Sequence, residues 1–191
     1  MRPRHPVPRL WLMTDERQGE ALWAALERLP RGSGVIFRHY GLPPAERRAL
    51  FERVRRVARR RRLVLIAAGR QGLRAQGRHG RGQRRSIGLR TAPAHDLPEI
   101  RAAERAGANL IFLSPAFPTR SHPGAHALGR VRFGLLARKT RVPIIALGGI
   151  TAKRMRGLPG AYGWAGVDLW SAPSGVRLGR FLRRRHRHVS T

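Results

Sequence analysis

The stretch LIFLSPAFPTRSHPGAHALG, residues 110–129, begins with four apolar residues and continues as a polar loop that contains three prolines. An apolar run this short, ended by Ser114-Pro115, is typical of a buried strand. Each proline fixes φ and removes a backbone donor, so the loop is stiff. Binding sites are often built on such loops, with an ordinary strand connection as the alternative. The side chains here that can bind an anion are Thr119, Arg120, Ser121 and His122.

On both sides of this stretch, short apolar runs alternate with longer amphipathic segments. The amphipathic segments carry apolar residues at helical spacing, and Gly107 is well placed to end one of them. This alternation predicts a parallel sheet with right-handed crossovers. Helices are predicted over residues 21–29, from residue 44 onward, and over residues 97–106, 130–139 and 176–185. Strands are predicted over residues 10–14, 35–37, 63–66, 77–80, 87–91, 109–113, 142–146 and 166–170.

Eight strands in this pattern predict an α/β fold of the (β/α)8 TIM-barrel type, in which the sheet closes on itself. An open doubly wound sheet is the alternative, but no GxGxxG motif follows the first strand. The fourth strand is the weakest, because residues 70–85, RQGLRAQGRHGRGQRR, show no apolar period. A stretch so rich in glycine and charge cannot bury the apolar face of a helix. We therefore expect a barrel shortened around its fourth βα unit.

Length and composition predict one globular domain over residues 1–191. A chain of 191 residues with 41% hydrophobic content can bury a sizeable core, and residues 183–191 are expected to form a basic tail. The absence of cysteine excludes disulfides and thiolate metal sites. No apolar run is long enough to span a bilayer, and the apolar residues 10–13 are too few for a signal-peptide core. We expect a cytoplasmic protein without a membrane partner.

The charge of the chain is strongly positive, with 40 Lys and Arg against 10 Asp and Glu and a net charge of +30. Such a charge attracts phosphorylated ligands, nucleic acids and anionic surfaces alike. Only Lys139 and Lys153 are lysines, and the arginines are spread along the whole chain. This dispersion favours a compositional bias over a dedicated nucleic-acid face, so specific nucleic-acid binding is not expected.

Polar or glycine residues follow several of the predicted strands. Arg38 follows the second strand, residues 119–122 follow the sixth, Gly148 and Gly149 follow the seventh, and Ser171 follows the eighth. In a (β/α)8 barrel these strand ends meet on one face, and phosphate commonly binds at the loops after the seventh and eighth strands. A glycine pair lets backbone N–H groups approach an anion, although it can also be a simple tight turn.

Three segments together resemble the thiamine phosphate synthase/TenI family of barrels. They are Thr14-Asp15 at the end of the first strand, the Phe-Pro-Thr-x-Ser-x-Pro-Gly-Ala loop at residues 117–125, and VPIIALGGI at residues 142–150. The resemblance covers most of the chain and is most specific in residues 109–150. Synthases of this family join hydroxymethylpyrimidine pyrophosphate to thiazole phosphate and release pyrophosphate, whereas TenI-type members isomerise the thiazole.

The resemblance implies a role for each candidate site residue. Gly148, Gly149 and Ser171 would hold the phosphate of the thiazole. Thr119 and Ser121 would face the other substrate or its leaving group, together with the two catalytic candidates, Arg38 and His122. His122 and also His95 are candidates for proton transfer, because an imidazole titrates near neutral pH. For both histidines a structural or solvated role is the alternative.

The departures from the family pattern concern the metal. The family's Gln-x-Arg-Glu-Lys pattern after the second strand is reduced to Arg38, and its Asn-Asp pair after the third strand is Ala68-Gly69. The acidic residue expected beyond the fourth strand has no counterpart in residues 77–85. By the resemblance, these carboxylates would hold Mg²⁺ on the pyrophosphate, so Mg²⁺ is expected from the family while its usual ligands are missing. We predict no metal-ligand residues and no certain cofactor.

The sequence therefore leaves three functions open. The first is a thiamine phosphate synthase or thiazole tautomerase of reduced or altered activity, acting on a phosphorylated small molecule. The second is a degenerate barrel that binds a phosphorylated ligand without turnover. The third is a basic nucleic-acid-binding protein, against which the 6% aromatic content argues weakly. A homodimer is also left open.

Overall fold

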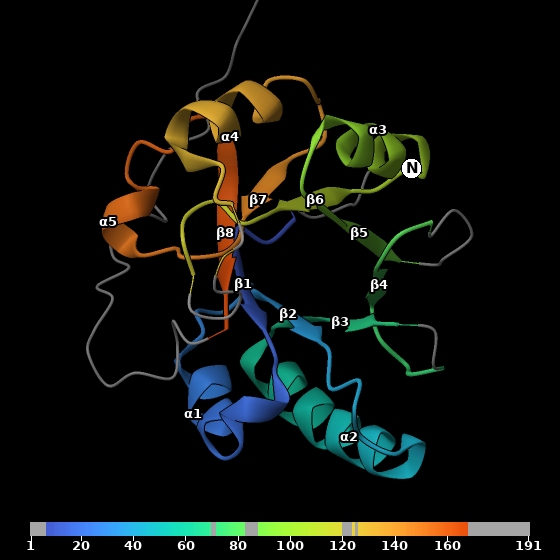
Figure 1. Cartoon of the computed structure of the whole chain (residues 1–191). Coiled ribbons are helices and arrows are strands. Elements are labelled where there is room, and N and C mark those ends of the chain that lie inside the picture. The colour runs from blue at the N-terminus through green and yellow to red at the C-terminus, as the bar shows by residue number, and fades with distance from the viewer. Residues whose placement is uncertain (1–6, 70–71, 83–87, 120–123, 125, 168–191) are drawn as a thin grey trace, which may run out of the picture.

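The protein is an eight-stranded parallel α/β barrel (Figure 1). The structure is a computed structural model, and it describes residues 7–69, 72–82, 88–119, 124 and 126–167. The strands, in barrel order, are β1 (Leu10–Met13), β2 (Gly34–Phe37), β3 (Val64–Ala68), β4 (Gly77–His79), β5 (Leu89–Ala94), β6 (Leu110–Leu113), β7 (Ile144–Ala146) and β8 (Ala161–Gly166). The helices are α1 (Ala21–Arg28), α2 (Pro44–Arg61), α3 (Leu97–Arg105), α4 (Gly129–Ala137) and α5 (Ala152–Met155), preceded by the short 3-10 helix η1 (Glu16–Gln18). The predicted barrel is confirmed.

The barrel interior is a packed core. Strand side chains alternate between the interior and the outer face, where the helices lie. Trp11 of β1 and Phe112 of β6 meet inside the barrel edge to face, with their ring centroids 5.4 Å apart. Gly34 of β2 makes room for the indole, since a Cβ there would lie 2.2 Å from Trp11. Because side chains fill the interior, a ligand can reach this barrel from its ends or from outside.

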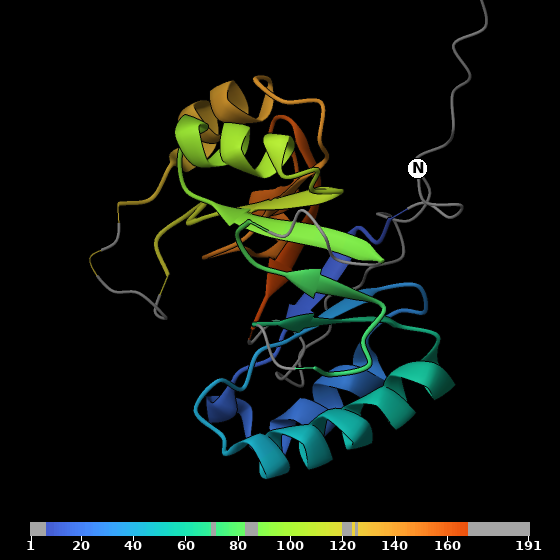
Figure 2. The ribbon, with the colours of Figure 1, turned by 90° about the vertical axis from the view of Figure 1, so that its right-hand side faces the viewer.

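The helical layer is interrupted around β4, as the sequence predicted. Residues 69–76 connect β3 to β4 and residues 80–88 connect β4 to β5, and the described parts of both connections contain no helix. Figure 2 shows β4 and β5 in front of the barrel, between α3 above and α2 below, with no helix covering β4. A crossover that holds a helix needs a dozen or more residues, and these connections are shorter.

The last strand lies earlier in the sequence than predicted. We expected residues 166–170, but β8 spans Ala161–Gly166, and residues 168–170 are not described. The sequence AYGWAG hides this strand because two glycines interrupt its apolar run. Gly163 is required there, since a Cβ would lie 2.0 Å from the carbonyl oxygen of Arg9, where the chain runs close beside β1. Ser171 therefore comes five residues after β8 and not directly at its end.

Most predicted helices are present with boundaries shifted by one or two residues. The α3 helix ends as expected, because Gly107 adopts φ 73° and its N–H donates to the carbonyl of Glu104. The four-residue helix α5 was not predicted. The predicted helix over residues 176–185 and the basic tail lie outside the described residues. Within the described ranges, no helix has the length and apolarity needed to cross a membrane.

Candidate active site at the barrel mouth

The carboxyl ends of the eight parallel strands meet at one end of the barrel, which we call the mouth. Arg38 lies here, directly after β2. Its Nε donates to the carbonyl of Thr14 at 2.7 Å and its Nη2 to Oδ2 of Asp15 at 2.6 Å. No acceptor in the described residues is bound to its Nη1. Arg38 is thus held in a fixed position with N–H groups still available to an anion.

Asp15 serves as the anchor for two arginines. Its Oδ1 accepts from Nε of Arg17 at 2.7 Å, and its Oδ2 accepts from Arg38. Hydrogen bonds from the Arg17 side chain, its backbone N–H and the charges of both arginines lower the pKa of Asp15 from 3.8 to about 2, against the opposing effect of burial. The carboxylate is therefore ionised at neutral pH and already engaged in positioning Arg38.

The Asp15 clamp predicts a pH dependence of stability. Because the folded pKa lies below the unfolded value of 3.8, the clamp contributes fully above pH 4 and is lost as the pH falls through about 2. A shift of this size corresponds to about 2 kcal/mol. Carbon-detected NMR of the Asp15 carboxyl should show the low pKa, and Arg17→Ala should raise it. A titration near 3.8 in the unmodified protein would contradict this geometry.

Arg47 holds the backbone at the mouth in place through hydrogen bonds. This α2 residue is 2% exposed, and its guanidinium donates to the carbonyls of Arg38, His39 and Ala68 at 2.8–3.2 Å. These carbonyls belong to the ends of β2 and β3, so one side chain fixes the spacing between two strand ends. The role of Arg47 was not recognised from the sequence. Its signal was its position in the buried stripe of α2 with Phe51.

His79 ends β4 inside the barrel. Its Nδ1 lies 2.8 Å from the hydroxyl of Thr91, and its ring meets Phe112 edge to face at 5.2 Å. In the part of the chain that is described, its Nε2 has no hydrogen-bond partner. Burial, with a smaller effect of the Arg38 charge, lowers the pKa of His79 to about 4. A neutral imidazole therefore lies at the floor of the mouth near Arg38. His79 was not recognised as a candidate from the sequence.

The lowered pKa of His79 has a measurable consequence. In the unfolded chain the His79 imidazole has a pKa of 6.5, whereas in the folded protein it is protonated only near pH 4. The folded state should therefore lose stability as the pH falls from 6.5 to about 4. Nitrogen-detected NMR should find the His79 ring neutral at pH 6, and His79→Gln should reduce the loss of stability over this range. A ring that titrates at or above pH 6.5 would contradict the buried placement.

The glycine pair after β7 packs against the loop after β6. Gly148 and Gly149 adopt φ 89° and 59°, and a Cβ at Gly149 would lie 2.3 Å from the carbonyl oxygen of Pro118. The N–H of Phe117 donates to the carbonyl of Gly148 at 3.1 Å, which ties the two loops together. Neither glycine N–H donates to another described residue. The N–H groups of these two half-buried glycines are thus left without an acceptor among the described residues, next to the loop after β6.

His95 is tied to the start of the same loop. Its Nδ1 lies 2.7 Å from the carbonyl oxygen of Ser114, so Nδ1 carries the proton and Nε2 is the acceptor in the neutral ring. The backbone N–H of His95 donates to Glu99 at 2.9 Å. His95 therefore has a positioned, exposed imidazole at the rim of the mouth.

The structure brings the described candidates to one end of the barrel. Arg38, Thr119, Gly148 and Gly149 all follow strand ends at the mouth. The remaining candidates, Ser121, His122 and Ser171, lie outside the described residues, as does Arg120.

The described residues of the mouth offer few ligands for Mg²⁺. No group of three histidine or acidic residues that could hold a metal ion occurs in the described ranges. Asp15 is engaged by Arg17 and Arg38, and the neighbouring Glu16 accepts from the N–H of Gly41 at 2.7 Å. The ends of β3 and β4 carry Ala68 and His79 in place of carboxylates. A hard cation needs several oxygen ligands, which these residues do not supply.

Comparison with known proteins connects this chain to a family. The family model described as "Thiamine monophosphate synthase" matches residues 74–172. The chain is 32% identical to "Putative thiamine-phosphate synthase 2" of Aquifex aeolicus over 182 residues, which cover 86% of this chain and 98% of that protein. It is 42% identical to the thiamine-phosphate synthase of Geobacillus thermodenitrificans over 82 residues, 41% of this chain and 36% of that protein.

A solved structure shares the fold. The thiamine phosphate pyrophosphorylase of Pyrococcus furiosus superposes with a TM-score of 0.71 at 21% identity, covering 86% of this chain and 88% of that one. The matched residues 74–172 include the glycine pair and the loop after β6. On this evidence, the chain belongs to the thiamine monophosphate synthase/TenI family.

Proposed function

We propose that the chain binds thiazole phosphate at the barrel mouth, with the phosphate on the backbone of Gly148 and Gly149. The observation that carries this proposal is the pair of N–H groups at these glycines, which have no acceptor in the described part of the chain and lie after β7, packed against the loop after β6. Backbone N–H groups in a left-handed turn form a concave anion site, and the loops after the seventh and eighth strands are the usual phosphate position in such barrels. Ser171 would complete this site.

We propose further that the second substrate, hydroxymethylpyrimidine pyrophosphate, lies between the glycine pair and Arg38. As pyrophosphate leaves, negative charge develops on its oxygen atoms, and a prepositioned guanidinium stabilises that charge without reorganising. The contacts of Arg38 with Thr14 and Asp15 support this role. Thr119, Ser121 and His122 would face the same substrate from the loop after β6.

The poor fit of Mg²⁺ sets the expected rate. Arginine stabilises leaving-group charge through hydrogen bonds, whereas Mg²⁺, if it were bound, would supply a higher local charge. We therefore propose slow turnover that is largely indifferent to Mg²⁺. The second candidate function is a barrel that binds a phosphorylated ligand without turnover. It is favoured by the ion pairs of Asp15 with Arg17 and Arg38, because this carboxylate is then occupied and is not available to a metal.

A turnover assay separates these functions. The full chain, given both substrates, should form thiamine phosphate slowly and at similar rates in EDTA and in millimolar Mg²⁺. Arg38→Ala should abolish this turnover, whereas Arg132→Ala, at an exposed arginine of α4, should leave it unchanged. Absence of product while thiazole phosphate still binds would favour the binding-only barrel. Fast, Mg²⁺-dependent turnover would refute the proposed role of Arg38.

A further inference from the structure

The loop after β6 orients the peptide groups at the glycine pair. The carbonyl of Leu147 accepts from the N–H of Ala116 at 2.8 Å, and the carbonyl of Gly148 accepts from the N–H of Phe117 at 3.1 Å. Both peptides are trans, so each N–H points opposite to its carbonyl oxygen. The N–H groups of Gly148 and Gly149, which belong to these two peptides, therefore point away from the loop after β6.

Arg154 of α5 extends this arrangement to a third peptide. Its Nη1 donates to the carbonyl of Gly149 at 2.7 Å, and its guanidinium lies over the ring of Phe117, with Cζ 5.2 Å from the ring centroid. This cation–π contact keeps the guanidinium on the same side of the glycine pair as the loop after β6. The N–H of Ile150, which shares its peptide with the Gly149 carbonyl, therefore points away from this loop as well.

Three consecutive N–H groups, those of residues 148–150, thus point to the same side. None of them donates to another described residue. No acidic residue occurs in the sequence between Glu104 and Asp168, so the loops after β6 and β7 contain no carboxylate that would repel an anion. Successive N–H groups with a shared direction form the kind of concave site that binds a phosphate.

We propose that Arg154 is a positioning residue of the phosphate site at the mouth, and that the N–H of Ile150 is a third donor of this site. The inference rests on the proposed function, because it adds a donor and its support to the same glycine pair. Arg154 acts through the Gly149 carbonyl, which it holds on the side of the loop after β6. Without this hydrogen bond the peptide between Gly149 and Ile150 can rotate, since glycine permits many backbone conformations, and its N–H is no longer held toward the ligand.

Variants of Arg154 separate its hydrogen bond from its charge. Arg154→Met keeps the length of the side chain but removes the donor, and it should weaken thiazole phosphate binding about tenfold or more, the usual effect of losing a hydrogen bond to a charged group. Arg154→Lys retains a donor and should restore most of the affinity.

Arg156→Met is the matched control. Arg156 is exposed, lies two residues further along the chain, and its side chain has no partner among the described residues. The substitution removes the same charge as Arg154→Met, but an exposed and screened charge contributes little. Its affinity for thiazole phosphate should therefore stay within about twofold of that of the unmodified protein.

NMR of the backbone amides shows which donors respond. In nitrogen–proton correlation spectra of the full chain, inorganic phosphate and thiazole phosphate should each shift the amide resonances of residues 148–150. In Arg154→Met the shift of the Ile150 amide should be lost, whereas Gly148 and Gly149 should still respond at higher ligand concentration. Arg154→Lys should recover the Ile150 shift. A residue that only supported the fold would lower stability without this selective loss.

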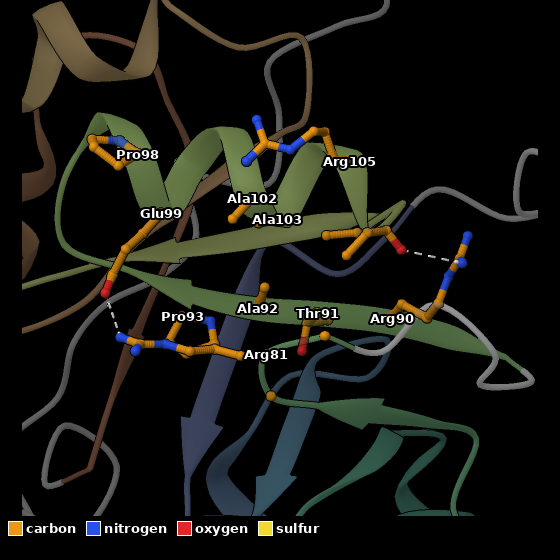
Figure 3. Close-up of a pocket in the computed structure, with 14 residues that line it drawn as sticks. Arg81, Arg90, Thr91, Ala92, Pro93, Pro98, Glu99, Ala102, Ala103 and Arg105 are labelled. Carbon is orange, nitrogen blue, oxygen red and sulfur yellow. Dashed lines mark hydrogen bonds and ion pairs between the residues drawn. The ribbon is translucent and has the colours of Figure 1, made fainter.

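The measurement must resolve individual sites, because arginines also line other surfaces. Three of them line the groove between α3 and β5 on the outer wall of the barrel (Figure 3). The amide resonances of Ala92 and Ala102, which line the same groove, report on phosphate that binds there. Any shift of these two resonances should be the same in the unmodified protein and in Arg154→Met.

Three results would overturn the inference. One is an equal loss of affinity in Arg154→Met and Arg156→Met, which would assign the effect to the overall charge. Another is an Ile150 amide that responds to neither ligand in the unmodified protein, which would exclude it as a donor. The third is a failure of Arg154→Lys to recover the Ile150 shift, which would mean that the hydrogen bond to Gly149 is not the cause.

The proposed function fails in a different way. Inorganic phosphate can shift the Ile150 amide, with loss of the shift in Arg154→Met and recovery in Arg154→Lys, while thiazole phosphate does not bind. That result would confirm the role of Arg154 and would refute only the proposed ligand of the mouth.

Discussion

Gly148→Asp is expected to abolish the binding of thiazole phosphate. The substitution would place a carboxylate at the proposed phosphate position and would block the backbone N–H groups. Like charges in contact cost several kcal/mol, so affinity should fall by about 100-fold or more. Calorimetry with thiazole phosphate measures the loss directly. Nonspecific binding of duplex DNA draws on the summed charge and should hardly change, which also tests the nucleic-acid alternative.

The control for this substitution must separate charge from backbone strain. Gly148 has φ 89°, and a Cβ there would lie 3.0 Å from Pro115, so any side chain is unfavourable at this position. Gly148→Ala carries the same strain without the charge and should weaken binding much less than Gly148→Asp. Equal losses in the two variants would mean that the loop conformation, and not the phosphate, explains the effect.

Arg47→Ala is expected to cause the largest loss of stability. The substitution leaves the carbonyls of Arg38, His39 and Ala68 without their donor in a buried place. An unsatisfied buried polar group costs about 1–3 kcal/mol, so the free energy of unfolding should fall by about 3 kcal/mol or more. Urea denaturation followed by tryptophan fluorescence measures the difference.

Arg48→Ala is the matched control, because it removes the next arginine of α2 at an exposed position. Its effect should stay within about 0.5 kcal/mol. Arg47 also fixes the carbonyl of Arg38. The Arg47→Ala protein that remains folded should therefore bind inorganic pyrophosphate more weakly than Arg48→Ala. A decrease in the free energy of unfolding of less than about 1 kcal/mol in Arg47→Ala would show that the hydrogen bonds of Arg47 contribute little to stability.

The elements that were predicted correctly from the sequence are those whose own apolar pattern identifies them. The β6 strand is a continuous apolar run and β2 is nearly so, and both lie within one residue of the prediction. The β8 strand was misplaced because its glycines serve close backbone packing, as Gly163 does against Arg9. That requirement comes from a partner distant in sequence, and no local pattern reveals it.

The candidate site shows the same division. Arg38, Gly148 and Gly149 were predicted because they follow strand ends, and parallel topology gathers strand ends on one face. Arg47 and His79 were missed because their importance depends on burial. An arginine inside a helix and a histidine in a glycine-rich stretch look solvated in sequence, and only the fold buries them against strand carbonyls and Thr91.

We propose that the mouth holds the phosphate of a thiazole through backbone N–H groups without a metal. Titration of thiazole phosphate into the full chain by calorimetry, in EDTA and again in millimolar Mg²⁺, tests it most directly. We expect one binding site with the same affinity under both conditions. Binding that requires Mg²⁺, or no binding under either condition, would contradict the claim.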